Sequence, residues 1–192
     1  FPADAAPADV AARLLGVNLS DLAAMGAEPD GYLLALALPR AWPAAQLESW
    51  LQGFAAGLGA SQEEHAIVLL GGDTVATPGP LTLTLTALGH VETGRALLRS
   101  GAGVGDLVYV SGSIGDAALG LRVFRGELPA LADRHRAFLL DRYRLPRPRL
   151  TLGRRLVGLA NAAADVSDGL VADLGHICAA SGVGARIDAD RV

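Results

Sequence analysis

Apolar residues recur along this chain with two periods, one typical of helices and one typical of strands. Spacing of three and four residues predicts helices over 7–25, 43–60, 113–124, 130–143, 149–159 and 167–180. Short apolar runs predict strands over 31–39, 66–70, 80–91, 105–112, 162–166 and 183–189. Because strands and helices mix in both halves, the pattern predicts an α/β or α+β fold. The pattern breaks after residue 91, so we place a junction there between domains at 1–91 and 92–192.

The predicted strands differ in how much of their surface we expect to be buried. Residues 31–39 (GYLLALALP) are almost continuously apolar and 66–70 (AIVLL) entirely so, which predicts burial on both faces. Residues 80–91 alternate Thr and Leu, which predicts a strand with one buried face.

A carboxylate interrupts the predicted apolar stripe of the first helix. Leu14, Val17, Asn18, Asp21 and Met25 fall at steps of three or four residues, so they share one side of that helix. A buried carboxylate costs several kcal/mol unless it is paired or binds a metal. Two interpretations of Asp21 stay open: it binds a cation, or the helix is slightly rotated and the side chain reaches solvent.

Two glycines and an aspartate follow the apolar run at 66–70. Gly71, Gly72 and Asp73 are expected at the carboxyl end of a buried strand, where open sheets bind ligands. Glycine permits close approach to the backbone, and the carboxylate suits a cation. The alternative is a Gly-Gly-Asp turn capped by Thr74.

A second acidic corner is predicted where the strand at 162–166 meets the helix at 167–180. Asp165 and Asp168 flank Ser167, which is a candidate helix N-cap. Such a corner suits a metal–phosphate pair, in which the carboxylates hold Mg²⁺ while the hydroxyl and the amide N–H groups hold phosphate oxygens. The alternative is an N-cap followed by an Asp-Gly turn.

Arg99 precedes a glycine-rich run, and its forked guanidinium suits phosphate oxygens, although lone arginines are usually surface residues. The segment 111–116 (SGSIGD) lacks the Lys-Ser/Thr ending of a P-loop. No two histidines stand at metal-ligand spacing. The separated aspartates, the glycines and one arginine together favour chemistry of Mg²⁺ and polyphosphate.

Composition removes several classes of function. The net charge is −4 and all 16 basic residues are arginine, so the chain offers no lysine for a phosphate loop or a Schiff base. The dispersed charge lacks the basic footprint of a nucleic-acid-binding protein. The single cysteine, Cys178, excludes a disulfide framework within the chain. No apolar run reaches the roughly 18 residues of a membrane span, so we expect a cytoplasmic setting.

The motifs occur together in the order and approximate spacing of the thiamine-monophosphate kinase family, which the chain resembles over nearly all of its length. The segments that carry the resemblance are VNLSDLAAMGAEP, LLGGDT, RSGAGVGDLVYVSG, IGDAALGL and DVSDGLVADLGHI. Either NLSDLAAMGA or DVSDGL alone would indicate only the wider aminoimidazole-ribonucleotide-synthetase-like superfamily. The resemblance implies a PurM-like two-domain α/β architecture with a mixed sheet. Its N-terminal domain would form a dimer and its C-terminal domain would close over a nucleotide, both incomplete here.

The resemblance further implies a cytoplasmic homodimer that converts thiamine monophosphate to thiamine diphosphate with ATP and Mg²⁺, by in-line phosphoryl transfer. The residues that it implies in ATP binding are Gly72, Asp73, Arg99 and Ser167. The residues that it implies as Mg²⁺ ligands are Asp21, Asp73, Asp165 and Asp168. No substrate-binding residue is carried over, because the family segments that form that pocket are absent from this chain. We therefore expect the chain to be inactive alone.

Some features leave alternatives open. The family often has a tyrosine near the nucleotide, where Phe54 and Ala55 align best in this sequence. A second hypothesis is another ATP-dependent enzyme of the superfamily, similar to aminoimidazole ribonucleotide synthetase. A third is a non-catalytic nucleotide-binding dimer module, which would bind ATP without turnover. No nucleic-acid or membrane partner is expected.

Overall fold

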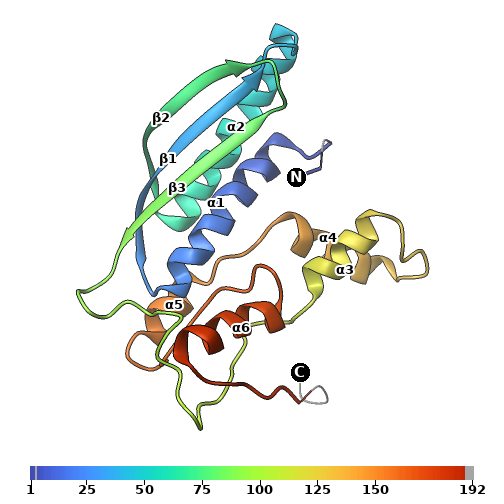
Figure 1. The fold of residues 1–192 in the computed structure, drawn as a ribbon. Coiled ribbons are helices and arrows are strands. Elements are labelled where there is room, and N and C mark those ends of the chain that lie inside the picture. The colour runs from blue at the N-terminus through green and yellow to red at the C-terminus, as the bar shows by residue number, and fades with distance from the viewer. Residues whose placement is uncertain (3, 189–192) are drawn as a thin grey trace. The chain divides into compact units, whose positions relative to one another are not determined.

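The computed structural model describes residues 1–2 and 4–188, and they form two compact units that Figure 1 colours along the chain. Unit 1 contains Phe1–Leu22, Glu28–His90 and Leu145–Pro148. Unit 2 contains Ala23–Ala27, Val91–Arg144 and the residues from Arg149 onward. The predicted mixture of helices and strands in one α/β fold is confirmed.

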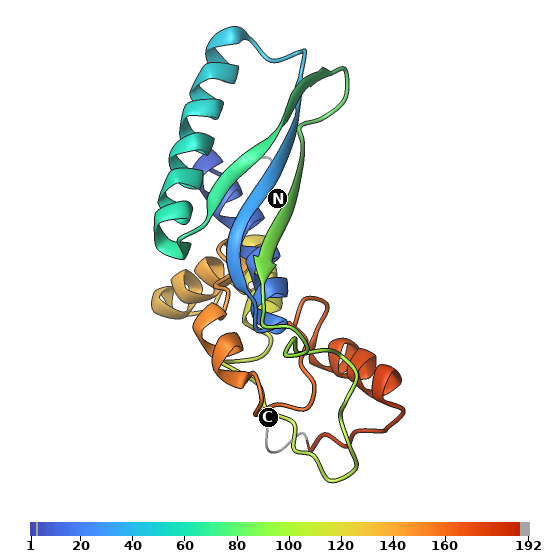
Figure 2. The same cartoon turned by 90° about the vertical axis from the view of Figure 1, so that its left-hand side faces the viewer.

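Unit 1 is a three-stranded sheet with helices on one face (Figure 1 and Figure 2). Its elements are α1 (Pro7–Ala24), β1 (Glu28–Pro39), α2 (Ala44–His65), β2 (Val68–Thr77) and β3 (Thr82–His90). The strand order is β2-β1-β3, with β2 parallel and β3 antiparallel to the central β1. Parallel strands need a long crossover connection, and α2 provides it between β1 and β2.

α1 and α2 pack together through small residues. α1 buries Ala11, Leu15 and Leu19 completely, at steps of four residues. Gly57 of α2 lies against the backbone of Ala8, because a Cβ atom at residue 57 would be 2.5 Å from the Ala8 Cα atom. The two helices are therefore closer at this point than any side chain at residue 57 allows.

Only one face of the sheet is buried, which corrects the expectation for 31–39 and 66–70. In β1, Tyr32 is fully buried on the helix side, whereas its neighbour Leu33 is 44% exposed. In the edge strand β2, the apolar residues 68–70 are 47% to 56% exposed, so neither face of the strand is buried at this point. A continuous apolar run fits burial on both faces, but among the described residues the helices cover only one of them.

Unit 2 is built from helices and irregular segments. The helices are α3 (Asp116–Phe124), α4 (Asp133–Arg144), α5 (Leu150–Leu156) and α6 (Leu170–Ser181). α3 and α4 pack as a pair, in which Gly120 lies directly against the Leu139 carbonyl. The rings of Phe124 and Tyr143 lie 5.8 Å apart between centroids and extend the same contact.

The strands predicted over 105–112, 162–166 and 183–189 do not form in the part of unit 2 that the structure describes. Ala189 itself lies outside the described residues. Leu107 and Tyr109 are 75% and 85% exposed, so the first of these segments has no packed partner along it. An apolar run becomes a strand only when another backbone forms a hydrogen-bonded ladder with it.

The Gly57 contact gives a direct test of the packing of α1 on α2. Gly57→Ala is expected to lower the free energy of unfolding by about 1–3 kcal/mol, because the new methyl group forces two backbones apart. Gly59 of the same helix has no atom within 4 Å of its Cβ position. Gly59→Ala is therefore expected to raise stability by up to about 1 kcal/mol through helix propensity. Denaturant unfolding of the full-length protein measures both, and equal effects would contradict the contact.

Candidate functional site

The residues predicted to bind ATP and Mg²⁺ fall into two groups, each positioned by the elements of its own unit. Unit 1 carries Asp21, Gly72 and Asp73, and unit 2 carries Arg99, Asp165, Ser167 and Asp168. Within the described ranges, no three His, Cys, Asp or Glu side chains gather where they could hold a metal ion. Neither group is a complete cation site made of protein side chains alone.

Asp21 lies on the exposed side of α1, which corrects the predicted apolar stripe. The buried stripe runs through Leu15 and Leu19, whereas Val17 and Met25 are 42% and 43% exposed. The Asp21 carboxylate therefore reaches solvent and is not a buried charge. An exposed carboxylate has no desolvation cost to offset, so Asp21 remains suited to a cation.

Gly72 and Asp73 lie in the middle of β2 and not at its end. The strand continues to Thr77, so the predicted strand end is wrong, and so is the alternative of a Gly-Gly-Asp turn. The register with β1 shifts by one residue just before these glycines, and such a bulge changes the direction of the residues that follow. Gly72 has φ of +154° and lies so close to the Leu34 carbonyl that no side chain fits.

Asp73 belongs to the face of the sheet that the helices leave open. It lies in register with Ala35 of β1, which in turn lies opposite Thr84 of β3, and all three are exposed. The Thr74 backbone N–H donates to Asp73 Oδ1 at 2.8 Å. This hydrogen bond orients the carboxylate on an accessible surface.

The corner at 165–169 is folded around Asp173, in the first turn of α6. Asp173 is 6% exposed, and its Oδ2 accepts the backbone N–H groups of Ser167 (3.0 Å), Asp168 (3.1 Å) and Gly169 (3.1 Å). Gly169 is the N-cap residue of α6, so the predicted Ser167 cap is wrong. These three amides already donate to a carboxylate, so they are not free to hold phosphate.

Because these amides donate to Asp173, the groups that the corner exposes determine whether it suits a cation or an anion. The three amides that lead into α6 would suit an anion if they were free, but the Asp173 carboxylate already accepts them. Ser167 and Asp168 are exposed beside the half-buried Asp165. Hydroxyl and carboxylate oxygens are ligands that Mg²⁺ prefers, so the corner suits a cation better than a bare phosphate.

Asp173 was not among the predicted site residues, although the sequence contains a signal for it. An acidic side chain in the first turn of a helix can reach back to the amides before it, as in a capping box. Asp173 is the acidic residue in the first turn of α6.

Ser181, the last residue of α6, holds the loop that follows Arg99. Its Oγ accepts the N–H groups of Gly101 and Ala102, both at 3.1 Å, and donates to the Arg99 carbonyl at 3.2 Å. The Arg99 side chain is exposed. The backbone at residue 99 is thus tied to α6 while the guanidinium stays accessible to a phosphate group.

Asp106 holds the other end of the same glycine-rich loop. Its carboxylate accepts the Gly103 N–H at 2.8 Å and the side-chain amide of Asn161 at 3.0 Å. The hydrogen bonds from Gly103 and then Asn161 lower the pKa of Asp106 below its usual value. A lowered pKa extends toward acid the pH range in which this carboxylate is charged and accepts both hydrogen bonds.

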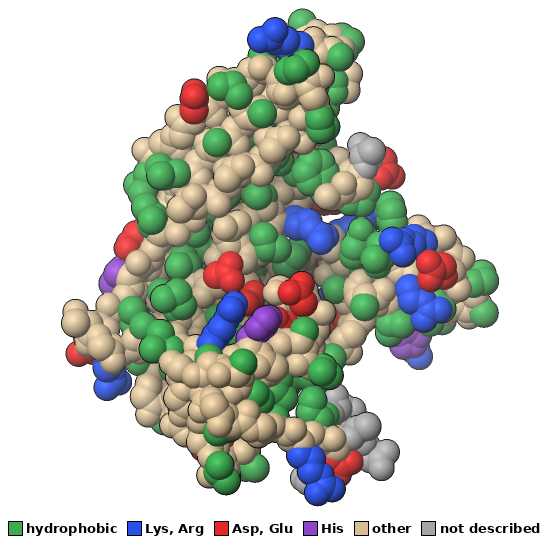
Figure 3. All heavy atoms as spheres, viewed as in Figure 1, with side chains coloured by type: hydrophobic (Ala, Val, Ile, Leu, Met, Phe, Trp, Pro, Cys, Tyr) green, Lys and Arg blue, Asp and Glu red, His purple; other side chains and the backbone are tan. Residues whose placement is uncertain are grey.

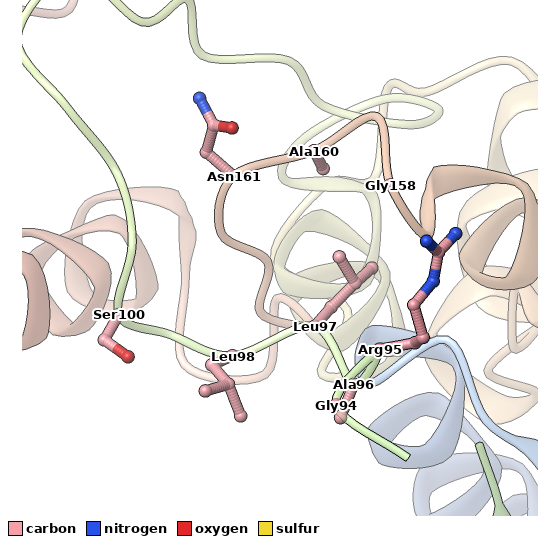
Figure 4. A pocket seen from close by; sticks show the side chains of 9 residues that line it. All are labelled: Gly94, Arg95, Ala96, Leu97, Leu98, Ser100, Gly158, Ala160 and Asn161. Carbon is pink, nitrogen blue, oxygen red and sulfur yellow. The ribbon is translucent and has the colours of Figure 1, made fainter. Parts of the chain in front are cut away.

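A pocket of about 330 Å³ lies beside this loop, between residues 94–100 and 158–161 (Figure 4). Leu97 in its wall is buried, and the Arg95 guanidinium lies against Gly158. None of the residues predicted to bind ATP or Mg²⁺ lines this pocket.

Among the described helices, none is both long and apolar enough to cross a membrane.

Two family models match the chain. The model of the N-terminal domain of AIR synthase related protein matches residues 1–91, and the model of its C-terminal domain matches residues 103–192. The thiamine-monophosphate kinases of Salmonella typhimurium and Escherichia coli are each 47% identical, over 190 and 188 residues. These matches cover 99% and 98% of this chain and 56% of each relative. The chain therefore spans about half the length of the curated relatives it matches.

Solved structures of such kinases have a similar fold. The enzyme from Stenotrophomonas maltophilia matches with a TM-score of 0.83 and 45% identity, over 95% of this chain and 57% of that one. A structure of AaThiL complexed with AMPPCP and TMP matches with a TM-score of 0.84 and 31% identity, over 95% of this chain and 56% of that one. The hydrogenase maturation protein HypE shares the fold, with a TM-score of 0.70 at 21% identity.

The two glycines of β2 are expected to differ in their response to the same substitution. Gly72→Ala is expected to lower the free energy of unfolding by about 2–4 kcal/mol, because its methyl group would collide with the Leu34 carbonyl and its φ disfavours a side chain. At Gly71 the nearest atom to an added Cβ is a Leu33 methyl group at 3.9 Å. Gly71→Ala is therefore expected to change stability by less than about 1 kcal/mol. Denaturant unfolding compares them, and a tolerated Gly72→Ala would contradict the strand position.

Proposed function

Because the chain belongs to the AIR synthase related protein family, we propose that its protein transfers the terminal phosphoryl group of ATP to thiamine monophosphate and forms thiamine diphosphate. The observation that carries this proposal is the 47% identity to thiamine-monophosphate kinases along nearly the whole chain. The similar structure complexed with AMPPCP and TMP supports the same pair of substrates. A role in thiamine biosynthesis in the cytoplasm follows from this activity.

The exposed oxygen donors of the two groups fit Mg²⁺. The residues that would hold it are Asp21, Asp73, Asp165 and Asp168. Mg²⁺ is usually held by one or two carboxylates, with substrate phosphates and water as its other ligands. When bound, Mg²⁺ offsets the negative charge of the phosphates.

The other site residues would bind and orient ATP. Arg99 would donate its forked N–H groups to phosphate oxygens, and Gly72 would let the nucleotide approach the β2 backbone. The Ser167 hydroxyl would contact the nucleotide beside the Asp168 carboxylate. The acceptor oxygen of thiamine monophosphate is already ionised at neutral pH, so transfer needs position and charge neutralisation more than a strong base.

A homodimer is the second part of this proposal, and the open face of the sheet supports it. Leu33, Val68, Val75 and Leu88 are apolar residues of this face, and each is 43% to 52% exposed. Figure 3 shows few charged side chains over the three strands. An open sheet face with exposed apolar residues and few charges is typical of an interface, and a second copy with the same face can cover it.

The dimer can be tested by placing a charge on this face. Leu33→Glu is expected to convert the full-length protein from dimer to monomer, because burying an unpaired carboxylate in an apolar interface is costly. Val104 of unit 2 is fully exposed, and Val104→Glu serves as the matched control. Light scattering after size-exclusion chromatography measures the mass of each variant. A dimeric Leu33→Glu protein, or a monomeric wild type, would overturn this interface.

The kinase activity can be tested with the full-length protein, ATP, Mg²⁺ and thiamine monophosphate. We expect thiamine diphosphate to form, and we expect Asp168→Asn and Asp21→Asn to lower kcat/KM by at least about 100-fold, because each removes a carboxylate that would hold the Mg²⁺ that offsets the phosphate charge. Asp133→Asn, at the exposed start of α4, is the control that should retain activity. Chromatographic separation of thiamine phosphates gives the readout. Nucleotide binding without product in the wild type would favour the non-catalytic module.

A further inference from the structure

We propose that Asp173 and Ser181, at the two ends of α6, are positioning residues for the nucleotide site of unit 2. This inference rests on the proposed function, because it takes Ser167, Asp168 and Arg99 as the residues that meet the metal and the phosphates. Neither Asp173 nor Ser181 has to touch a ligand. Each acts through the hydrogen bonds that hold a loop on the helix.

Asp173 sets the conformation of the acidic corner. One oxygen, Oδ2, accepts N–H groups from the consecutive residues Ser167, Asp168 and Gly169, at 3.0 to 3.1 Å. Three hydrogen bonds to one oxygen fix the backbone of this segment and therefore the direction in which the Asp168 side chain leaves it. Hydrogen bonds to a charged acceptor are stronger than neutral ones. A carboxylate that is 6% exposed also needs such partners to be tolerated.

Ser181 does the same for the loop that carries Arg99. Its hydroxyl makes one hydrogen bond as donor, to the Arg99 carbonyl, and two as acceptor, from Gly101 and Ala102. A hydroxyl has one proton and two lone pairs, so these contacts use its full capacity. The loop also makes a backbone hydrogen bond from Ala163 N–H to the Leu98 carbonyl, 2.9 Å long. Hydrogen bonds to Ala163 and Ser181 therefore hold the backbone on both sides of Arg99.

The helix between the two residues links their effects. Asp173 and Ser181 lie eight residues apart in α6, which corresponds to about 12 Å along a helix axis. Because a helix is stiff over this length, it sets the separation between the backbone of the acidic corner and the backbone at Arg99. The separation between a cation bound at the acidic corner and a phosphate group bound at Arg99 would then depend on α6.

The experiment compares Asp173→Asn, Ser181→Ala and Ser181→Thr in the full-length protein. Calorimetry with Mg²⁺ and a non-hydrolysable ATP analogue gives nucleotide affinity, and a turnover assay gives kcat and the KM of each substrate. We expect Asp173→Asn to weaken nucleotide binding at least about fivefold and to raise the Mg²⁺ concentration for half-maximal activity. Ser181→Ala should weaken nucleotide binding about three- to tenfold, with no recovery at high Mg²⁺. Ser181→Thr keeps the hydroxyl and should restore affinity to within about twofold.

The recovery with Mg²⁺ separates positioning from a merely structural role. Partial recovery of Asp173→Asn at high Mg²⁺, with an unchanged KM for thiamine monophosphate and a melting temperature near that of the wild type, supports the proposal. Unchanged nucleotide affinity in Asp173→Asn and Ser181→Ala overturns it. The proposal is also overturned if the melting temperature falls, all kinetic parameters worsen together, and high Mg²⁺ restores none of them. If the wild type binds nucleotide but forms no product, the kinase proposal is wrong. The roles of Asp173 and Ser181 are then still tested, because calorimetry measures nucleotide affinity without turnover.

Discussion

Contact between main chains at glycine is the constraint on which the packing of both units depends. In unit 1, Gly57 of α2 lies against Ala8 of α1, and in unit 2, Gly120 of α3 lies against the Leu139 carbonyl of α4. Aromatic residues make up only 5% of the chain, so few side chains are large enough to fill a wider gap between helices. Dense packing is then reached by bringing backbones together, which accounts for glycines inside helices where propensity alone disfavours them.

The helices could be predicted from the sequence because their signals are local. Pro7 begins α1, and Gly182 follows α6 in a left-handed conformation, as proline and glycine commonly do at helix ends. The alternation in β3 was informative for the same reason, since Leu85 is buried between the exposed Thr84 and Thr86. The three strands expected in unit 2 depended instead on partners distant in the sequence, and apolar content alone says nothing about such partners.

The types of candidate residue could be predicted more readily than their surroundings. The Gly-Gly-Asp sequence suggested the end of a strand, because glycine usually marks turns. In the structure, Gly72 is needed inside β2, where it lies against the Leu34 carbonyl. Asp21 was placed on a buried stripe because Val17 and Met25 flank it, yet both are exposed. Periodicity identifies the faces of a helix, but only the packed structure shows which of them is covered.

The buried carboxylate of Asp173 shows why the chemistry of unit 2 could not be derived from spacing alone. A serine before a helix suggests free amides at the N-terminus, and free amides suggest a site for phosphate. Here the amides turn inward to Asp173, and their partial positive charge is offset inside the protein. In the proposed kinase, the carboxylates of the acidic corner would reach a phosphate through a cation, while Arg99 would reach one directly. Both loops are hydrogen-bonded to α6, through Asp173 and Ser181. The helix that accepts the amides of the acidic corner therefore also sets the distance between that corner and the backbone at Arg99.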